Sequence, residues 1–413
     1  MLPIRNAVLP LLLCLAPCAA QTTWIVTQAN GVQSAIQGAA PGDVLLLPNT
    51  GGFPDYSPFT VDKGVTIRGN GCRIGWGAPG SSANVHELVV AVPAGQRAHL
   101  DGLDLTWSYH YAYQSSIGMR LVINGGSVTV QRCSITCHNG QAVTVQGANV
   151  VCQACTITAP GMPYAGGPGI SAQTSYLELS DCQVVGSDMT NWLIGVHVFR
   201  WPAQAAVELM NSTLHAERTA LFGGNYTPSP WGLPAAAGAC GLNVAGASKT
   251  FLADGTITGG NSGPGVVGAT ALCNASADPV HLANVTLVAG AAGGLPSTGP
   301  VDPSAPLARL QVAPPLQRGV TSTFTCLGLP GDPFALVIAY DPAPVTHPYL
   351  VEPIWATNHG FVTGGLLDAS GRATVAIPVP AQPSLQHQVF WFEAAAGTGL
   401  PMHATTLAGG AIL

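Results

Sequence analysis

Five side chains that could carry out acid–base chemistry lie between residues 188 and 217: Asp188, His197, Arg200, Glu208 and Glu217. Carboxyl and imidazole groups can exchange protons, and a guanidinium group can stabilise developing negative charge. Together they form an atypical set for cleaving a polysaccharide. Each also has a structural interpretation: His197 suits an exposed strand among aromatic residues, and Glu217 can form a local ion pair with Arg218.

Aromatic residues gather in several loops of the chain. Exposed Trp and Tyr rings stack on sugar rings, so these loops form a candidate binding surface for extracellular polysaccharide or cell-surface glycan. The candidates are Trp107, Tyr109, Tyr111, Tyr164, Trp192, Trp201, Tyr226 and Trp231. The alternative is that each ring packs beneath its own loop.

A nine-residue pattern recurs seven times between residues 98 and 288 and indicates how these residues are positioned. The copies begin at Ala98, Val128, Val150, Leu177, Val207, Thr250 and Val280. Positions three and eight are apolar in every copy, and positions two, four and seven are mostly polar, which is the alternation of short half-buried strands. Position five is Gly, Asn or Asp in five copies, which predicts a sharp left-handed bend there.

A further strand precedes most copies, for example at residues 120–124, 142–146, 169–173, 194–199 and 241–245. Because the copies recur about every 27 residues with the same orientation, each coil is expected to stack in parallel on the previous one. Three parallel strands per coil, with no helical crossover, predict an all-β fold, a right-handed parallel β-helix. An amphipathic helix at residues 31–39 would cap its open N-terminal end.

The segment ahead of the first copy carries a resemblance to a known family. It contains the helix, Ala40-Pro41-Gly42-Asp43, an apolar strand and then Lys63-Gly64-Val65-Thr66-Ile67-Arg68-Gly69. This order resembles the opening of secreted proteins of the pectate-lyase-like right-handed β-helix superfamily, and the resemblance covers about residues 24–290. It implies the fold, whereas the activity is left open because that superfamily includes lyases, hydrolases, epimerases and non-catalytic surface proteins.

In that superfamily the catalytic groove runs along the strands that precede the repeats. A lyase of this kind needs acids that hold calcium and a basic residue, and a hydrolase needs two or three carboxylates. The predicted outward row is Val122, Thr144, Ser171, His197 and Asn243, with Asn124, Gln146, Gln173 and Phe199 beside it. Neither row contains an acid or a lysine, which argues against standard pectate lyase or polygalacturonase chemistry. Glu178 and Glu208 share position two of the repeat and are expected on adjacent coils, as a carboxylate pair or a solvated face.

Composition and cysteine content limit the partners and the compartment. Charged residues make up 8% of the chain and the formal net charge is −6, so neither nucleic acid nor an anionic membrane is an expected partner. Residues 1–20 combine Arg5, an apolar run and Ala19-Ala20, which predicts a secretory signal peptide and a secreted or cell-surface location. Cys133, Cys155 and Cys182 are expected to fill an interior column as small apolar side chains, with a disulfide among them as the alternative. No metal or cofactor is predicted.

The C-terminal part has a different all-β pattern. Residues 291–306 are rich in Gly, Pro and Ser and predict a linker, and residues 307–413 predict a small β-sandwich. The run at residues 365–380 resembles a β-sandwich module appended to secreted bacterial proteins of unrelated function. That resemblance implies an accessory or surface-association role.

The sequence therefore predicts a signal peptide at 1–20, a β-helix at 21–290, a linker at 291–306 and a β-sandwich at 307–413. The leading functional hypothesis is a secreted, non-catalytic protein that binds extracellular polysaccharide or cell-surface material through its aromatic loops. One alternative is a polysaccharide lyase or glycoside hydrolase with an atypical active site. The other is a structural or adhesive surface component.

Overall fold

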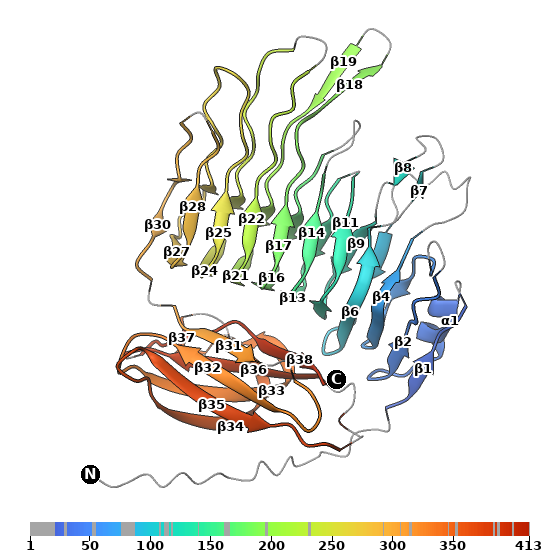
Figure 1. Ribbon diagram of the computed structural model, residues 1–413, viewed down its shortest axis with the longest axis vertical. Helices are drawn as coiled ribbons and strands as arrows, with labels where there is room; N and C mark the ends of the chain where they lie inside the picture. The colour runs from blue at the N-terminus through green and yellow to red at the C-terminus, as the bar shows by residue number, and fades with distance from the viewer. Residues whose placement is uncertain are drawn as a thin grey trace.

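The structure is a computed structural model. It describes residues 21–412 apart from 29–30, 52–54, 76–86, 107–108, 111–114, 117–118, 139, 161–165, 195–196, 230–232, 292, 306, 314–315, 346, 352–353, 383–384, 386–388 and 399. Residues 1–20, expected to be a signal peptide, lie outside the described residues. Figure 1 shows a stack of coils with a second, smaller β-structure along one side.

The stack consists of three lines of parallel strands. Sheet 1, which contains the strands that precede the repeats, comprises β3 (Thr60–Val61), β5 (Glu87–Val90), β9 (Arg120–Asn124), β12 (Val143–Gln146), β15 (Ile170–Gln173), β20 (Val207–Met210), β23 (Leu242–Ala245), β26 (Leu272–Asn274) and β29 (Ser297–Thr298). Sheet 2 comprises β1 (Thr23–Ile25), β2 (Val44–Leu46), β4 (Thr66–Arg73), β6 (Arg97–Leu105), β10 (Ser127–Gln131), β13 (Asn149–Gln153), β16 (Tyr176–Ser180), β21 (Thr213–Glu217), β24 (Lys249–Ala253), β27 (Val280–Ala283) and β30 (Val301–Asp302).

Sheet 3 begins with the last residues of β6. It continues with β11 (Ser134–Thr136), β14 (Thr156–Thr158), β17 (Gln183–Val185), β22 (Ala220–Phe222), β25 (Thr256–Thr258) and β28 (Thr286–Val288). The apolar residues of all three sheets meet in one continuous core, and helix α1 (Gly31–Gly38) buries Val32 and Ile36 at the N-terminal end of the stack. The predicted parallel β-helix with an N-terminal capping helix is therefore confirmed.

Strand pairing confirms six of the seven predicted copies and corrects one. Val128 pairs with Ala98 and Val150, but Leu177 pairs with Leu214 rather than with Val207. Val207 instead lies in sheet 1, where it pairs with Ile170. The predicted copy at Val207 was seven residues too early because an antiparallel hairpin, β18 (Thr190–Ile194) and β19 (His197–Trp201), is inserted ahead of it.

Two left-handed positions per coil define the turns. Between sheets 2 and 3, Gly102, Arg132, Ala154, Asp181, Arg218, Asp254 and Asn284 all have φ between 48° and 64°. Between sheets 1 and 2, Thr174 and Asn211 have φ of 50° and 51°. Asn211 is thus a turn residue as predicted, but at the other turn, which explains why the Val207 segment resembled a repeat.

Interior polar side chains link successive coils. The Ser175 amide donates to the Ser212 hydroxyl, and the Ser212 amide donates to the Ser248 hydroxyl, both at 3.1 Å. The thiols of Cys133, Cys155 and Cys182 are free and buried, and each donates to main-chain carbonyl groups, so the alternative of a disulfide in this column is wrong. The disulfide joins Cys240 to Cys273 instead.

The C-terminal strands form two antiparallel sheets around a separate core. One sheet contains β31 (Arg309–Ala313), β32 (Thr321–Leu327) and β35 (Arg372–Pro378); the other contains β34 (Ile354–Leu366), β33 (Pro333–Val345), β36 (Val389–Ala396), β37 (His403–Ala404) and β38 (Ala408–Ala411). Phe324 and Phe392 stack between them with ring centroids 4.2 Å apart. The predicted linker at 291–306 is partly structured, because β29 and β30 lie within it and extend sheets 1 and 2.

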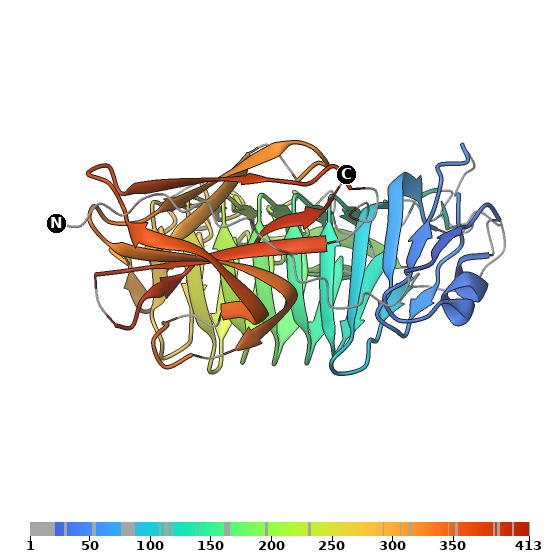
Figure 2. The ribbon, with the colours of Figure 1, turned by 90° about the horizontal axis from the view of Figure 1, so that it is seen from below.

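The sandwich lies along sheet 2 across several coils, on the side away from the β18–β19 hairpin (Figures 1 and 2). Val151 of β13 packs against Trp391 and Leu407 of the sandwich in a shared apolar cluster. The outward residues of sheet 2 are accordingly buried, including His99, Thr129, Glu178, His215 and Phe251. Sheet 2 is thus an interface, and sheets 1 and 3 remain as the open faces.

The serine column generates a stability prediction. Ser212→Ala removes the acceptor of the Ser175 amide and leaves this buried N–H group without its hydrogen bond. We expect the free energy of unfolding to fall by about 1–3 kcal/mol, as measured by denaturant unfolding. Thr156→Ala, on the exposed face of sheet 3, is the control and should stay within about 0.5 kcal/mol of wild type. Equal effects of the two substitutions would contradict a specific contribution from the serine column.

Candidate functional site

The outward row of sheet 1 is the best candidate for a ligand-binding surface. Its strands pair in register, so that one residue of each coil lies beside the next: Val89, Val122, Thr144, Ser171, Glu208, Asn243 and Cys273. Side chains alternate between the core and solvent along each strand, and these residues are the half-exposed ones. Glu208 occupies the place predicted for His197, so the prediction that this row lacks an acid is wrong.

Glu208 lies between neutral hydrogen-bonding residues. Ser171 and Asn243 flank it on the neighbouring strands, and Asn243 forms a side-chain hydrogen bond with it. Partial burial raises the pKa of Glu208, and the hydrogen bond from Asn243 opposes that rise. Such a carboxyl group could act as a proton donor or accept hydrogen bonds from sugar hydroxyls.

The rest of the row offers no second catalytic carboxylate. Glu87 lies on β5, four strands away from Glu208 along the sheet, and forms an ion pair with Arg120 on β9. The adjacent outward row is Asn124, Gln146, Gln173, Met210 and Ala245, in which Met210 replaces the predicted Phe199. Among the residues that the structure describes, these two rows of sheet 1 therefore present amides, hydroxyls, apolar side chains such as Val122 and Met210, and one carboxyl group, that of Glu208.

The long loops between sheets 3 and 1 are held together at their bases. The Asp188 carboxylate accepts hydrogen bonds from the Asn225 amide at 2.7 Å and from its side chain at 3.1 Å. The Asn225 side chain accepts a hydrogen bond from the Asn261 amide, and the Asn261 side chain accepts one from the Ala291 amide, each at 2.9 Å. Asp188 is thus the first residue of a series of hydrogen bonds that aligns the loops. This residue was a catalytic candidate in the sequence, and its contacts in the structure are structural.

The β18–β19 hairpin projects from the coil beside sheet 1 (Figure 1). Arg200 on this hairpin donates to the Pro234 carbonyl at 2.6 Å and to the Asn191 side chain at 3.4 Å. Asn191 also donates to the Thr227 carbonyl at 3.2 Å. These bonds fasten the hairpin to the following loop, so Arg200 has a structural role in this part of the chain. His197 belongs to β19, outside the sheet 1 row.

Glu217 and Glu178 lie on a different face of the β-helix. Both are buried on sheet 2, with exposed fractions of 1% and 0%, and both contact the C-terminal sandwich. Glu217 forms the predicted ion pair with Arg218. The prediction that Glu178 and Glu208 lie on adjacent coils of one face is wrong, because it depended on the misplaced copy at Val207. The sequence candidates therefore do not converge on one catalytic centre.

The aromatic candidates are placed only in part. Four of them lie outside the described residues: Trp107, Tyr111, Tyr164 and Trp231. Two others are placed only by the backbone of their strands, Tyr109 in β7 (Tyr109–His110) and Trp192 in β18. Trp201 and Tyr226 are half-buried. A methyl group added to Gly263 would lie 2.9 Å from the Tyr226 ring, so this ring packs against a neighbouring loop. The half-buried Tyr226 ring therefore contacts the loop of the next coil.

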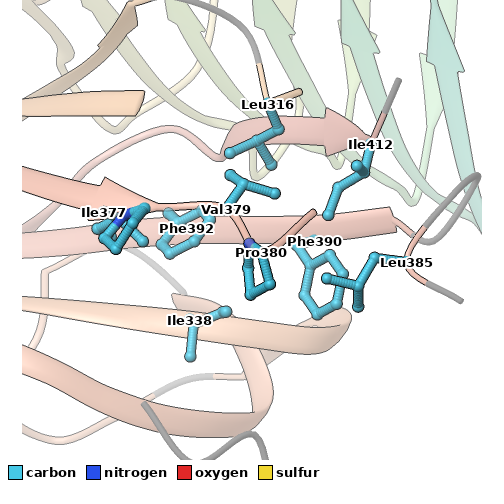
Figure 3. Close-up of a pocket in the computed structure, with 10 residues that line it drawn as sticks. Leu316, Ile338, Ile377, Val379, Pro380, Leu385, Phe390, Phe392 and Ile412 are labelled. Atoms are coloured by element: carbon cyan, nitrogen blue, oxygen red, sulfur yellow. The ribbon is translucent and has the colours of Figure 1, made fainter. Parts of the chain in front are cut away.

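A well-formed pocket lies elsewhere, within the sandwich (Figure 3). Its lining is apolar and includes Leu316, Ile338, Phe390, Phe392 and Ile412, all of which belong to the buried core of that domain. Among the described residues that line it, there is no polar side chain that could orient a ligand or carry chemistry. The described residues also contain no cluster of three or more His, Cys, Asp or Glu that could hold a metal ion.

Comparison with known proteins gives only weak similarities. No family model and no curated protein matches the sequence. Pectate lyase Pel9A is 11% identical with a TM-score of 0.40, over 63% of this chain and 68% of its own. The full-length tailspike protein 2 of an Escherichia coli O157:H7 bacteriophage is 10% identical with a TM-score of 0.27, over 91% of this chain and 61% of its own. The likeness is one of architecture alone.

The Glu208–Asn243 contact generates a prediction about protonation. Asn243→Leu removes the hydrogen bond that lowers the pKa of Glu208 while leaving the burial that raises it. We therefore expect the pKa of Glu208 to rise in this variant, measured by carboxyl-carbon NMR titration. Ser171→Ala, on the other neighbouring strand, is the matched control and should shift it less. An unchanged pKa in Asn243→Leu would show that the contact is absent in solution.

Proposed function

We propose that this chain is a secreted protein that binds a neutral polysaccharide along sheet 1 without cleaving it. The observation that carries the proposal is the outward row itself, which crosses successive coils with Thr144, Ser171 and Asn243 around a single carboxyl group, Glu208. Hydroxyl and amide groups repeated along one line suit the repeated hydroxyl groups of an extended glycan.

The charges beside the row favour a neutral ligand over a polyuronate. Arg120 is engaged by Glu87, and Arg200 is engaged by the Pro234 carbonyl and Asn191. The remaining charge in the row, on Glu208, would repel a carboxylated sugar. Cleavage by the usual glycosidase route requires a second carboxylate, and the described part of the row has none.

A secreted location is part of this proposal. The predicted signal peptide and the Cys240–Cys273 disulfide both suit an oxidising, extracellular compartment. Within the described residues, the structure has no helix long and apolar enough to cross a membrane.

The position of Glu208 also favours a second candidate, a lyase or hydrolase with an atypical site. A partly buried carboxyl group with a raised pKa is suited to act as a general acid, and Glu208 is the sequence candidate that lies in the outward row of sheet 1. In that case its partner residues would come from the loops and the β18–β19 hairpin.

Binding is tested with paired arginine substitutions. Thr144→Arg places a large cation in the proposed groove, whereas Thr156→Arg places the same side chain on the open face of sheet 3. We expect Thr144→Arg to weaken binding to the preferred neutral glycan at least tenfold in affinity electrophoresis or calorimetry, and Thr156→Arg to leave it nearly unchanged. Equal loss in both variants, or preferential binding to polyuronates, would contradict the proposal. No retention on any glycan would favour a structural or adhesive component.

Turnover separates the two candidates. The non-catalytic proposal predicts neither new reducing ends nor an unsaturated product after prolonged incubation with a glycan that the protein retains. If product does form, Glu208→Gln should reduce the rate by at least about 100-fold while retaining binding, because it removes the exchangeable proton and preserves the side-chain shape.

A further inference from the structure

The contact between the sandwich and sheet 2 contains a fully buried carboxyl group. Glu178 is 0% exposed, and its Oε1 atom accepts a hydrogen bond from the Leu407 amide of the sandwich at 2.5 Å. Its Oε2 atom is buried and has no hydrogen-bond partner among the described residues. A carboxylate in this position would leave one charged oxygen without a donor or solvent, which is costly, whereas the protonated form carries no net charge.

A second carboxyl group makes the ionisation of Glu178 still less favourable. On β21, His215 is the register partner of Glu178, and Glu217 lies two residues further along the strand and raises the pKa of Glu178. Glu217 itself is held by Arg218, which also pairs with Asp181, and by the Thr406 hydroxyl of the sandwich. On β36, Glu393 is buried on the same side as Trp391, two residues along the strand.

The other end of the interface is held by different contacts, beside Phe251, whose ring lies between those of His215 and His281. Arg309 of β31 forms an ion pair with Asp254 at 2.6 Å, and Phe251 and Ala253 pack against Ala305 and Leu307. Because Glu178 does not contribute to these contacts, we expect the attachment of residues 305–309 to change less with pH than that of residues 405–409.

We propose that the sandwich is a pH-sensitive cover of sheet 2, in which protonated Glu178 holds residues 405–409 in place and ionised Glu178 releases them. Release would uncover the buried polar row that contains Glu178, His215 and Glu217, while the Arg309 end remains attached as a hinge.

The sign of the effect follows from the direction of the pKa shift. Burial raises the pKa of Glu178 to about 8, so the covered state binds more protons than the open state. The cover is therefore favoured at acidic pH and is progressively lost as pH rises from the ordinary range of a glutamate through about 8. Burial raises the pKa of Glu217 to about 7, which acts in the same direction.

His99 makes the covered state less stable as the solution becomes more acidic, which is the opposite of the effect of Glu178. It packs against Trp391 with ring centroids 6.4 Å apart, and neither ring nitrogen has a hydrogen-bond partner among the described residues. Burial lowers its pKa to about 4, so the covered state disfavours the protonated ring and loosens as pH falls toward that value. The cover is consequently most stable in mildly acidic solution.

Hydrogen–deuterium exchange of the full-length protein tests the proposal directly. We expect the protection factors of residues 405–409, corrected for intrinsic exchange, to fall on the order of 10- to 100-fold between pH 6 and pH 9. Residues 305–313 should change less over the same range. Glu178→Gln keeps the size of the side chain and the acceptor for the Leu407 amide, and it should abolish most of this dependence.

Two further variants make the test specific. Glu217→Gln removes the charge that faces Glu178 and should move the midpoint of the transition to lower pH. Glu208→Gln, a carboxyl substitution on sheet 1, should leave the wild-type transition in place. Constant protection of residues 405–409 in the wild type, or an unchanged pH dependence in Glu178→Gln, would overturn the proposal. The pH dependence of residues 405–409 in the wild type tests the release of the cover even if a variant does not fold.

Discussion

The structure depends on the hydrogen bonds that join each left-handed turn residue to the coil above it. The amides of Arg132, Ala154, Asp181 and Arg218 donate to Gln153, Ser180, Glu217 and Ala253 respectively, at distances between 2.9 and 3.1 Å. A left-handed conformation costs a residue other than glycine roughly 1–2 kcal/mol. The inter-coil hydrogen bond offsets that cost, and it fixes the register, because a slip of one residue would turn every core side chain toward solvent.

This constraint explains what the sequence could and could not predict. The nine-residue pattern predicted the coils correctly because the apolar positions and the bend must recur in each coil. Arg132 and Ala154 showed that the bend does not require Gly, Asn or Asp once neighbouring coils impose it. The register failed at Val207 because the chain bends left-handed twice per coil, so the segment around Asn211 satisfies the same pattern at the other turn. One misplaced coil was enough to remove Glu208 from the predicted groove and to put His197 there.

The covered face could not be predicted for a different reason. Period-two alternation separates core from non-core positions, but it does not show what lies outside. Glu178 and His215 occupy outward positions of sheet 2 and have the composition of a solvated face, yet the sandwich buries both. Their burial comes from contacts with residues more than 150 positions later, such as Leu407, for which local sequence carries no signal.

The distribution of charge separates Glu208 from the other carboxyl groups of the β-helix. Several carboxylates of the β-helix are neutralised by arginine, as in Asp101 with Arg132, Asp254 with Arg309, and Glu87 with Arg120. These pairs hold turns, domains and strands together, and a group already engaged in this way is poorly placed to meet a ligand. Glu208 differs because its hydrogen-bond partner is the neutral Asn243, and because it lies on an open sheet rather than beneath the sandwich. The carboxyl group of Glu208 is thus not engaged by an arginine as these others are, and this is why the proposed contact with a ligand is placed along sheet 1.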